Sequence, residues 1–209
     1  MPRQLSIFDE GPPDGDERPD VAPVDVPPRD PSVRHTLFLA LSLDAAQAPA
    51  MAATGARLAR QFAPGSRPVE AQRLHVSLYA LASEVEALPR SLVDLGLRAG
   101  ARVERPAFDV VFDRVARFGA GALVLACASP DALGELHAFR ASLGIALADA
   151  GFPVTTAKIT PHMTIAYGAR ERVDVAVEPV RWRATGFVLI HSHVGAHRHD
   201  VLGRWPLAA

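Results

Sequence analysis

The sequence predicts an α+β protein with mainly antiparallel sheets. Apolar segments of strand length alternate with three longer segments that have helical spacing, and the last strands follow one another with only short connections. The 209 residues are 49% apolar and 22% charged, the ordinary mixture of a globular chain. No run approaches 18 apolar residues and Cys127 is the only cysteine, so we expect no membrane span, no disulfide framework and a cytoplasmic location.

The order of elements follows from apolar spacing and from turn and capping residues. The pair Ser129-Pro130 has the capping hydroxyl and first-turn proline typical of a helix start, and Gly119 to Gly121 fit a hairpin turn. The expected helices cover residues 44–62, 85–97 and 129–151. The expected strands cover residues 36–43, 73–81, 108–113, 122–128, 158–167, 180–191 and 199–205.

The first 31 residues differ in composition from the rest of the chain. They contain eight of the 18 prolines and eight acidic residues against three basic ones. Such a segment buries too little apolar surface to offset the entropy of ordering it, so we expect a disordered tail at residues 1–31 and a folded domain at residues 32–209. The domain carries a net charge of +4, which suits an anionic ligand but does not by itself indicate a nucleic-acid-binding protein.

One short pattern occurs twice inside the expected strands. Residues 74–78 read Leu-His-Val-Ser-Leu and residues 161–165 read Pro-His-Met-Thr-Ile. Of the eight histidines, only His75 and His162 have a hydroxyl residue two positions later. Because positions i and i+2 of a strand share a face, each histidine stands beside its hydroxyl, Ser77 or Thr164, while the residues between them point into a core.

Two such units that face each other could catalyse the in-line opening of a phosphodiester. One imidazole would accept a proton and the other donate one, while the two hydroxyls would hold the phosphate oxygens. Either motif alone is more simply interpreted as an ordinary strand histidine with structural hydrogen bonds. The pair, in matching strands of two halves of the chain, favours catalysis by His75, His162, Ser77 and Thr164.

The chain resembles the 2H phosphoesterases, most closely the bacterial RNA 2′,3′-cyclic phosphodiesterase group that is often labelled 2′-5′ RNA ligase. The similar segments lie between residues 33 and 207: TLFLALSL, RLHVSLYAL, TPHMTIAYG, FVLIHSHVG and VLGRWPL. The resemblance implies a bilobal, pseudo-twofold fold with two mainly antiparallel sheets around a central cleft. It also implies hydrolysis of 2′,3′-cyclic phosphates at RNA ends or reversible 2′-5′ ligation, with His75 as the general acid and His162 as the base.

The sequence departs from this pattern after the second motif. Some relatives have an arginine three residues past the second hydroxyl, where this chain has Tyr167, and no basic residue follows before Arg170. Strict alternation along the strands places Arg73 and Tyr79 on the face of His75, and Lys158 on the face of His162. We therefore expect Arg73 and Lys158 to supply the positive charge and Tyr79 to stack on a base.

Other functions remain open on the sequence alone. A non-catalytic module that binds RNA ends or nucleotides would keep the fold without turnover, and a related hydrolase could act on a small cyclic nucleotide. Four histidines near the C-terminus, His191, His193, His197 and His199, match no standard metal-binding spacing, so we expect neither a metal site nor a cofactor. We expect a monomer.

The tail contains one apolar cluster, Gln4-Leu5-Ser6-Ile7-Phe8. It resembles the short peptides with which bacterial replication and repair proteins bind the sliding clamp, and such a segment can become ordered on a hydrophobic groove. A labelled peptide of residues 1–15 is therefore predicted to bind the clamp saturably in a fluorescence titration. A peptide with Leu5 and Phe8 replaced by alanine is the control, and equal binding by both peptides would refute the docking motif.

Overall fold

The computed structural model describes residues 34–154, 160–196 and 198–209. The expected disordered tail, the clamp-like peptide, Lys158 and His197 lie outside these residues. Among the helices of the described part, none is both long enough and apolar enough to cross a membrane.

The described residues form three α-helices, one short 3₁₀ helix and nine strands. The α-helices are α1 (Ala48–Phe62), α2 (Arg90–Gly100) and α3 (Pro130–Asp149), and the 3₁₀ helix covers Ala71–Arg73. The strands are β1 (Arg34–Ser42), β2 (Arg67–Pro68), β3 (His75–Val85), β4 (Phe108–Phe118), β5 (Ala122–Ala126), β6 (His162–Tyr167), β7 (Asp174–Ala184), β8 (Gly186–Val194) and β9 (Arg198–Pro206). The α+β class with antiparallel pairing, expected from the sequence, is confirmed.

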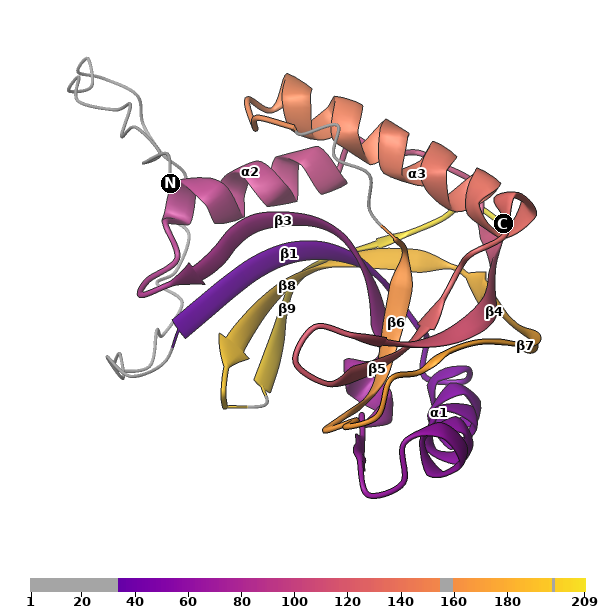
Figure 1. Ribbon diagram of the computed structural model, residues 1–209. Helices are drawn as coiled ribbons and strands as arrows, with labels where there is room; N and C mark the ends of the chain where they lie inside the picture. Colours follow the sequence, from indigo (N-terminus) through magenta and orange to yellow (C-terminus); the bar gives the residue numbers. More distant parts are fainter. Residues whose placement is uncertain (1–33, 155–159, 197) are drawn as a thin grey trace, which may run out of the picture. The chain divides into compact units, whose positions relative to one another are not determined.

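The strands form two four-stranded halves that meet in the middle of one sheet. The sheet order is β7-β4-β5-β6-β3-β1-β8-β9, and β2 pairs with β6 beside this path. Read outward from the centre, the first half is β3, β1, β8, β9 and the second half is β6, β5, β4, β7 (Figure 1). The two halves correspond to the two lobes implied by the family resemblance, but they form one sheet and not the two sheets expected, because β3 and β6 pair at the centre.

The junction between the halves is a single residue pair. Strand β3 of the first half and β6 of the second half are antiparallel, and within the described residues they pair only at Val76 and Met163. Both side chains are fully buried. These are the two residues that lie between histidine and hydroxyl in the repeated motif, so the sheet brings the two motifs together at its centre.

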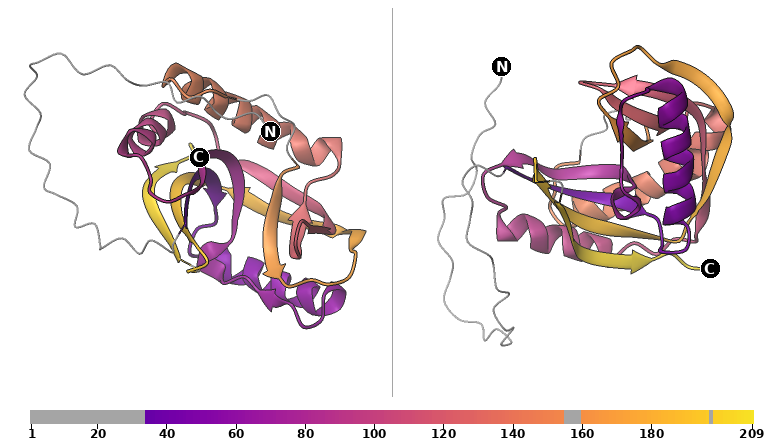
Figure 2. Two further views of the ribbon diagram at one scale, coloured as in Figure 1. Left: turned by 60° about the vertical axis from the view of Figure 1, so that its left-hand side comes forward. Right: turned by 90° about the horizontal axis from the view of Figure 1, so that it is seen from below.

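Helices reach across the junction and hold the halves together. Helix α1 follows β1 of the first half but packs on β6 of the second, where a Cβ at Gly55 would lie 3.1 Å from the Cβ of Ile165. Helix α3 follows β5 of the second half, and its Arg140 donates a hydrogen bond from Nε to the carbonyl of Leu78 in β3 (3.2 Å). Figure 2 shows α1 on the side of this part of the molecule away from α2 and α3.

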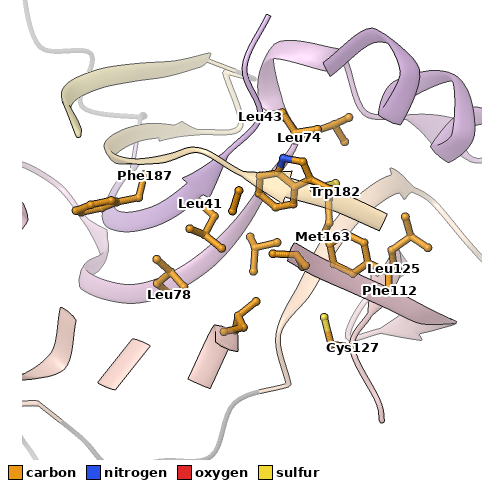
Figure 3. Close-up of a cluster of buried hydrophobic side chains, with 14 of the residues drawn as sticks. Leu41, Leu43, Leu74, Leu78, Phe112, Leu125, Cys127, Met163, Trp182 and Phe187 are labelled. Carbon is orange, nitrogen blue, oxygen red and sulfur yellow. The ribbon is translucent and has the colours of Figure 1, made fainter. Parts of the chain in front are cut away.

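One hydrophobic core spans both halves. Leu41 and Leu78 from the first half pack in the same cluster as Phe112, Leu125 and Met163 from the second (Figure 3). Two smaller apolar clusters cover the other face of the sheet, one in each half. They consist of Phe38, Ala40, Val188 and Ile190 in the first half and Ala116, Val124 and Ala126 in the second.

The expected strand at residues 180–191 is wrong in extent. The structure has two strands there, β7 and β8, which meet at Thr185 and belong to opposite halves of the sheet. Apolar residues alternate through the end of β7 and run consecutively from Phe187 to Ile190 in β8, with only Thr185 between the two strands, so the sequence does not show where the chain passes from one half to the other. The second expected helix also starts later, at Arg90, because β3 continues to Val85.

Two glycines in helices give a matched test of the packing. A Cβ at Gly100 of α2 would clash with the Trp205 ring of β9, whereas a Cβ at Gly134 of α3 would meet no described atom within 4 Å. Gly100→Ala is predicted to lower the free energy of unfolding by about 1–3 kcal/mol through overpacking. Gly134→Ala is predicted to raise it by about 0.4–1 kcal/mol. Urea unfolding of both variants checks this, and equal effects would contradict the packing of α2 on β9.

Candidate active site

The two motifs line one cleft between the halves. In an antiparallel ladder centred on Val76 and Met163, His75 comes to lie opposite Thr164 and Ser77 opposite His162. All four side chains border the same cavity, which has a volume of about 710 Å³. The structure thus brings together the four residues that the sequence marked as catalytic candidates.

The two imidazoles are oriented by the same hydrogen bond. Nδ1 of His75 lies 2.7 Å from the carbonyl oxygen of Arg73, and Nδ1 of His162 lies 2.8 Å from that of Thr160. In each case the acceptor is the backbone two residues before the histidine. A neutral ring that donates from Nδ1 keeps its lone pair on Nε2, which leaves that nitrogen available for proton transfer.

An aromatic ring packs beside each histidine. The Phe38 ring in β1 lies 5.1 Å from the His75 ring, and the Phe118 ring at the end of β4 lies 4.9 Å from the His162 ring in an edge-on arrangement. Burial lowers the pKa of His75 below its ordinary value of 6.5, the carbonyl of Arg73 opposes this shift, and the nearby charges of Arg73 and His162 add to it. Free His75 therefore favours its neutral form more strongly than an exposed histidine does.

A β-bulge follows each motif directly. In the pairing of β1 with β3, Ala40 pairs with Ser77 but Leu39 pairs with Tyr79, so Leu78 is an extra residue. In the pairing of β5 with β6, Ile165 is the extra residue after Thr164. Each bulge reverses the alternation of the strand, so that two consecutive side chains after each hydroxyl point into the core.

The expected position of Tyr79 on the face of His75 is wrong, because the bulge turns this side chain into the core. Its side chain is only 8% exposed and belongs to the core, not to the face of His75. Its hydroxyl donates to the carbonyl of Arg140 (3.2 Å), and the Arg140 guanidinium lies 4.4 Å above its ring. Although Tyr79 borders the cavity, its engaged ring is not placed to stack on a base, because strict alternation does not hold across the bulge.

Two arginines border the cleft beside the motifs. Arg73 ends the 3₁₀ helix just before His75, and its Nε is buried without a hydrogen-bond partner among the described residues. Arg67 in β2 pairs with Tyr167, three residues past Thr164, where some relatives carry an arginine. Sequence reasoning missed Arg67, because the short strand β2 gives no periodic signal. The side chain of Lys158, the other expected cation, lies outside the described residues.

The C-terminal histidines separate into two groups. His199 in β9 borders the cleft, and its ring lies 5.4 Å from that of His75. Burial, reinforced by the charges of His75 and Arg73, lowers the pKa of His199 to about 4. His191 and His193 instead approach His35, and sequence reasoning had not grouped those three.

Cys127 is buried, as expected of an inert core residue, and burial raises its pKa to about 12.

Comparison with known proteins identifies the family. The sequence pattern of the 2′-5′ RNA ligase superfamily matches residues 33–196, which is most of the chain. The chain belongs to this superfamily, and so to the 2H phosphoesterases. A search of curated proteins gave no match.

Solved structures share the fold over nearly their whole length. Escherichia coli LigT in its apo form is 25% identical, with a TM-score of 0.61 over 85% of this chain and 100% of LigT. A protein described as a phosphoesterase is 24% identical, with a TM-score of 0.62 over 84% of this chain and 99% of the other. The protein TT0787 of Thermus thermophilus is 20% identical, with a TM-score of 0.57 over 82% of this chain and 97% of TT0787.

The shared hydrogen bond to the preceding backbone predicts the tautomer of both site histidines. In their neutral forms, His75 and His162 should both carry the proton on Nδ1. Long-range ¹H–¹⁵N NMR correlations at a pH where both rings are neutral would show this, with His75→Gln and His162→Gln used to assign the signals. A proton on Nε2 in either ring would contradict the geometry.

Proposed function

We propose that the protein opens 2′,3′-cyclic phosphates at RNA ends by acid–base catalysis with two histidines. We also propose that the same site can reversibly form a 2′-5′ linkage, in which the 5′-hydroxyl of a second RNA end attacks the phosphorus in place of water. The observation that carries this proposal is the meeting of the two motifs about the Val76–Met163 pair. Escherichia coli LigT, which shares the fold, has been solved with 3′-AMP, ATP and phosphate. We also propose that the protein acts in the cytoplasm.

The mechanism follows from the four motif side chains. Water attacks phosphorus while Nε2 of His162 takes its proton, and His75 donates a proton to the ribose oxygen whose bond to phosphorus breaks. Ser77 and Thr164 donate hydrogen bonds to the non-bridging oxygens. An acid must hold its proton, which burial disfavours in free His75. The negative charge of the bound phosphate counteracts this effect.

Positive charge around the cleft supports a phosphate ligand. Arg73 borders the cleft just before His75, so its guanidinium can place a positive charge beside a phosphate held between the two motifs. Arg67 lies on the strand beside Tyr167 and borders the cleft. It could replace the arginine that this chain lacks after the second motif.

The surface beside His162 favours RNA over a small cyclic nucleotide. A second hollow of about 510 Å³ is lined by Arg114, Arg117 and Arg172, and it shares Thr160 with the cleft. Asp174 pairs with Arg114 there and offsets part of the charge. A cationic surface that continues from the site suits a polynucleotide backbone, which a mononucleotide would not reach.

Activity measurements with a substrate panel test the proposal. Oligonucleotides with a 2′,3′-cyclic phosphate should be hydrolysed with a higher kcat/KM than cyclic mononucleotides or 2′-5′ linked oligomers. Replacement of His75 or His162 by alanine should lower kcat by about 10²–10⁴, because each positioned acid or base contributes that much. The double variant should lose much less than the product of the two single losses, since the histidines act as a unit.

His137→Ala is the matched control. His137 is exposed on α3, outside the cleft, so this variant should keep the activity of the unmodified protein.

Ser77→Ala and Thr164→Ala should each cost about 1–3 kcal/mol of transition-state binding. Unchanged turnover in the double histidine variant would refute the mechanism. A preference for cyclic mononucleotides would favour the small-substrate alternative, and binding without turnover would favour a binding module.

The lowered pKa of His75 predicts the pH dependence. His75, as the acid, must be protonated while His162, as the base, must be neutral, so kcat/KM should follow a bell. Because the pKa of free His75 is lowered, the limb that reports its deprotonation should lie below pH 6.5. The charge of Arg73 contributes to the lowered pKa, so Arg73→Gln should move this limb to higher pH while it also reduces kcat/KM. Full pH–rate profiles of both proteins check this, and equal positions of both limbs in the two profiles would contradict the assignment.

A further inference from the structure

Three imidazoles gather at the end of the first half, where β1 begins and β8 ends. One ring nitrogen from each of His35, His191 and His193 lies within 4.8 Å of the other two. Nε2 of His191 lies 2.8 Å from Nδ1 of His35. The ring centroids of His191 and His193 are 4.1 Å apart. None of the three belongs to the repeated motifs.

Strand pairing places this cluster apart from the catalytic pair. His35 pairs with His193, and Leu37 pairs with His191, so the three rings alternate with Thr36 and Phe38, which line the cleft. His193 also borders the edge of the cleft. The cluster therefore lies between the start of β1 and the end of β8, and it is separate from His75 and His162.

We propose that His35, His191 and His193 form a binding site for a divalent transition-metal ion such as Zn²⁺. Zinc binds imidazole nitrogens at about 2.0–2.1 Å, which separates two tetrahedral ligands by about 3.4 Å. One pair of nitrogens in the cluster is 2.8 Å apart and all three lie within 4.8 Å of one another, a range that brackets this separation, so rotation of the rings would let them surround one ion. Three nitrogen donors favour Zn²⁺, Ni²⁺ or Cu²⁺ over Mg²⁺ and Ca²⁺, which prefer oxygen.

A carboxylate completes the environment of the cluster. Oδ2 of Asp200 in β9 lies 2.7 Å from Nε2 of His193, and carboxylates commonly orient metal-binding histidines in this way. The guanidinium of Arg198 lies 2.7 Å from the same nitrogen, 3.3 Å from Nδ1 of the ring and 3.2 Å from Asp200, so it must turn aside before Nδ1 can bind an ion. The Asp200 carboxylate offsets that positive charge. His35, His191, His193 and Asp200 stand on the paired strands β1, β8 and β9. The sheet therefore sets the spacing of these four side chains before an ion binds.

The bound ion would stabilise the fold rather than catalyse the reaction. It would tie β1 to β8 near the β8–β9 hairpin, and an ion that binds only the folded chain raises the free energy of unfolding. The proposed chemistry assigns both proton transfers to His75 and His162, so hydrolysis should not require the ion.

The experiment uses the full chain without a polyhistidine tag, stripped of metal with a chelator. Calorimetric titration with ZnCl₂ should show one ion per chain, and Co²⁺ should give visible d–d absorption typical of tetrahedral coordination. His35→Gln, His191→Gln and His193→Gln should each weaken binding at least about tenfold, and Asp200→Asn about 10–100-fold. His137→Gln, on the exposed face of α3, is the control and should bind as the unmodified chain does.

Two further readouts separate metal binding from damage to the fold. Zn²⁺ should raise the unfolding temperature of the unmodified chain and of His137→Gln but not that of His191→Gln, while circular dichroism confirms that each variant is folded. Hydrolysis of cyclic-phosphate RNA should be equal in stripped and loaded protein. Absence of saturable one-to-one binding, or unchanged binding in all three histidine variants, would overturn the site. Loss of hydrolysis on stripping, restored by Zn²⁺, would overturn its structural role.

Discussion

The pairing of Val76 with Met163 is the contact on which the site depends. Within the described part of the chain it is the one place where β3 and β6 form a ladder, and the residues on either side of it are the histidines and hydroxyls of the two motifs. A longer ladder would hold the two strands against one another and close the cleft. A single pair instead lets the strands diverge, so that the same contact joins the halves and leaves room between them for a ligand.

Because that ladder is so short, the halves are held together by elements that cross between them. Helix α1 leaves the first half and packs on the second, and α3 leaves the second half and bonds to β3 through Arg140. Trp182 of β7 donates to the side chain of Gln47, just before α1. These contacts fix the distance between the two imidazoles, which neither strand could set alone.

The sequence predicted what lies on each strand better than how the strands meet. The spacing of His75 with Ser77 and of His162 with Thr164 identified both motifs, since alternation is local and exact over two residues. It failed for Tyr79, where a bulge adds a residue, and at Thr185, where the chain changes halves inside one apolar pattern. Arg67, His199 and the approach of His35 to His191 depend on pairing between distant segments, which periodicity does not encode.

The bulges at Leu78 and Ile165 divide each central strand into two stretches with different tasks. Before the bulge each strand presents a histidine and a hydroxyl to the cleft, and at the bulge two consecutive side chains turn into the core. The four motif side chains therefore all precede the residue at which the alternation changes. Chains that differ in the core packing at the bulge can keep the same pair of histidines in register.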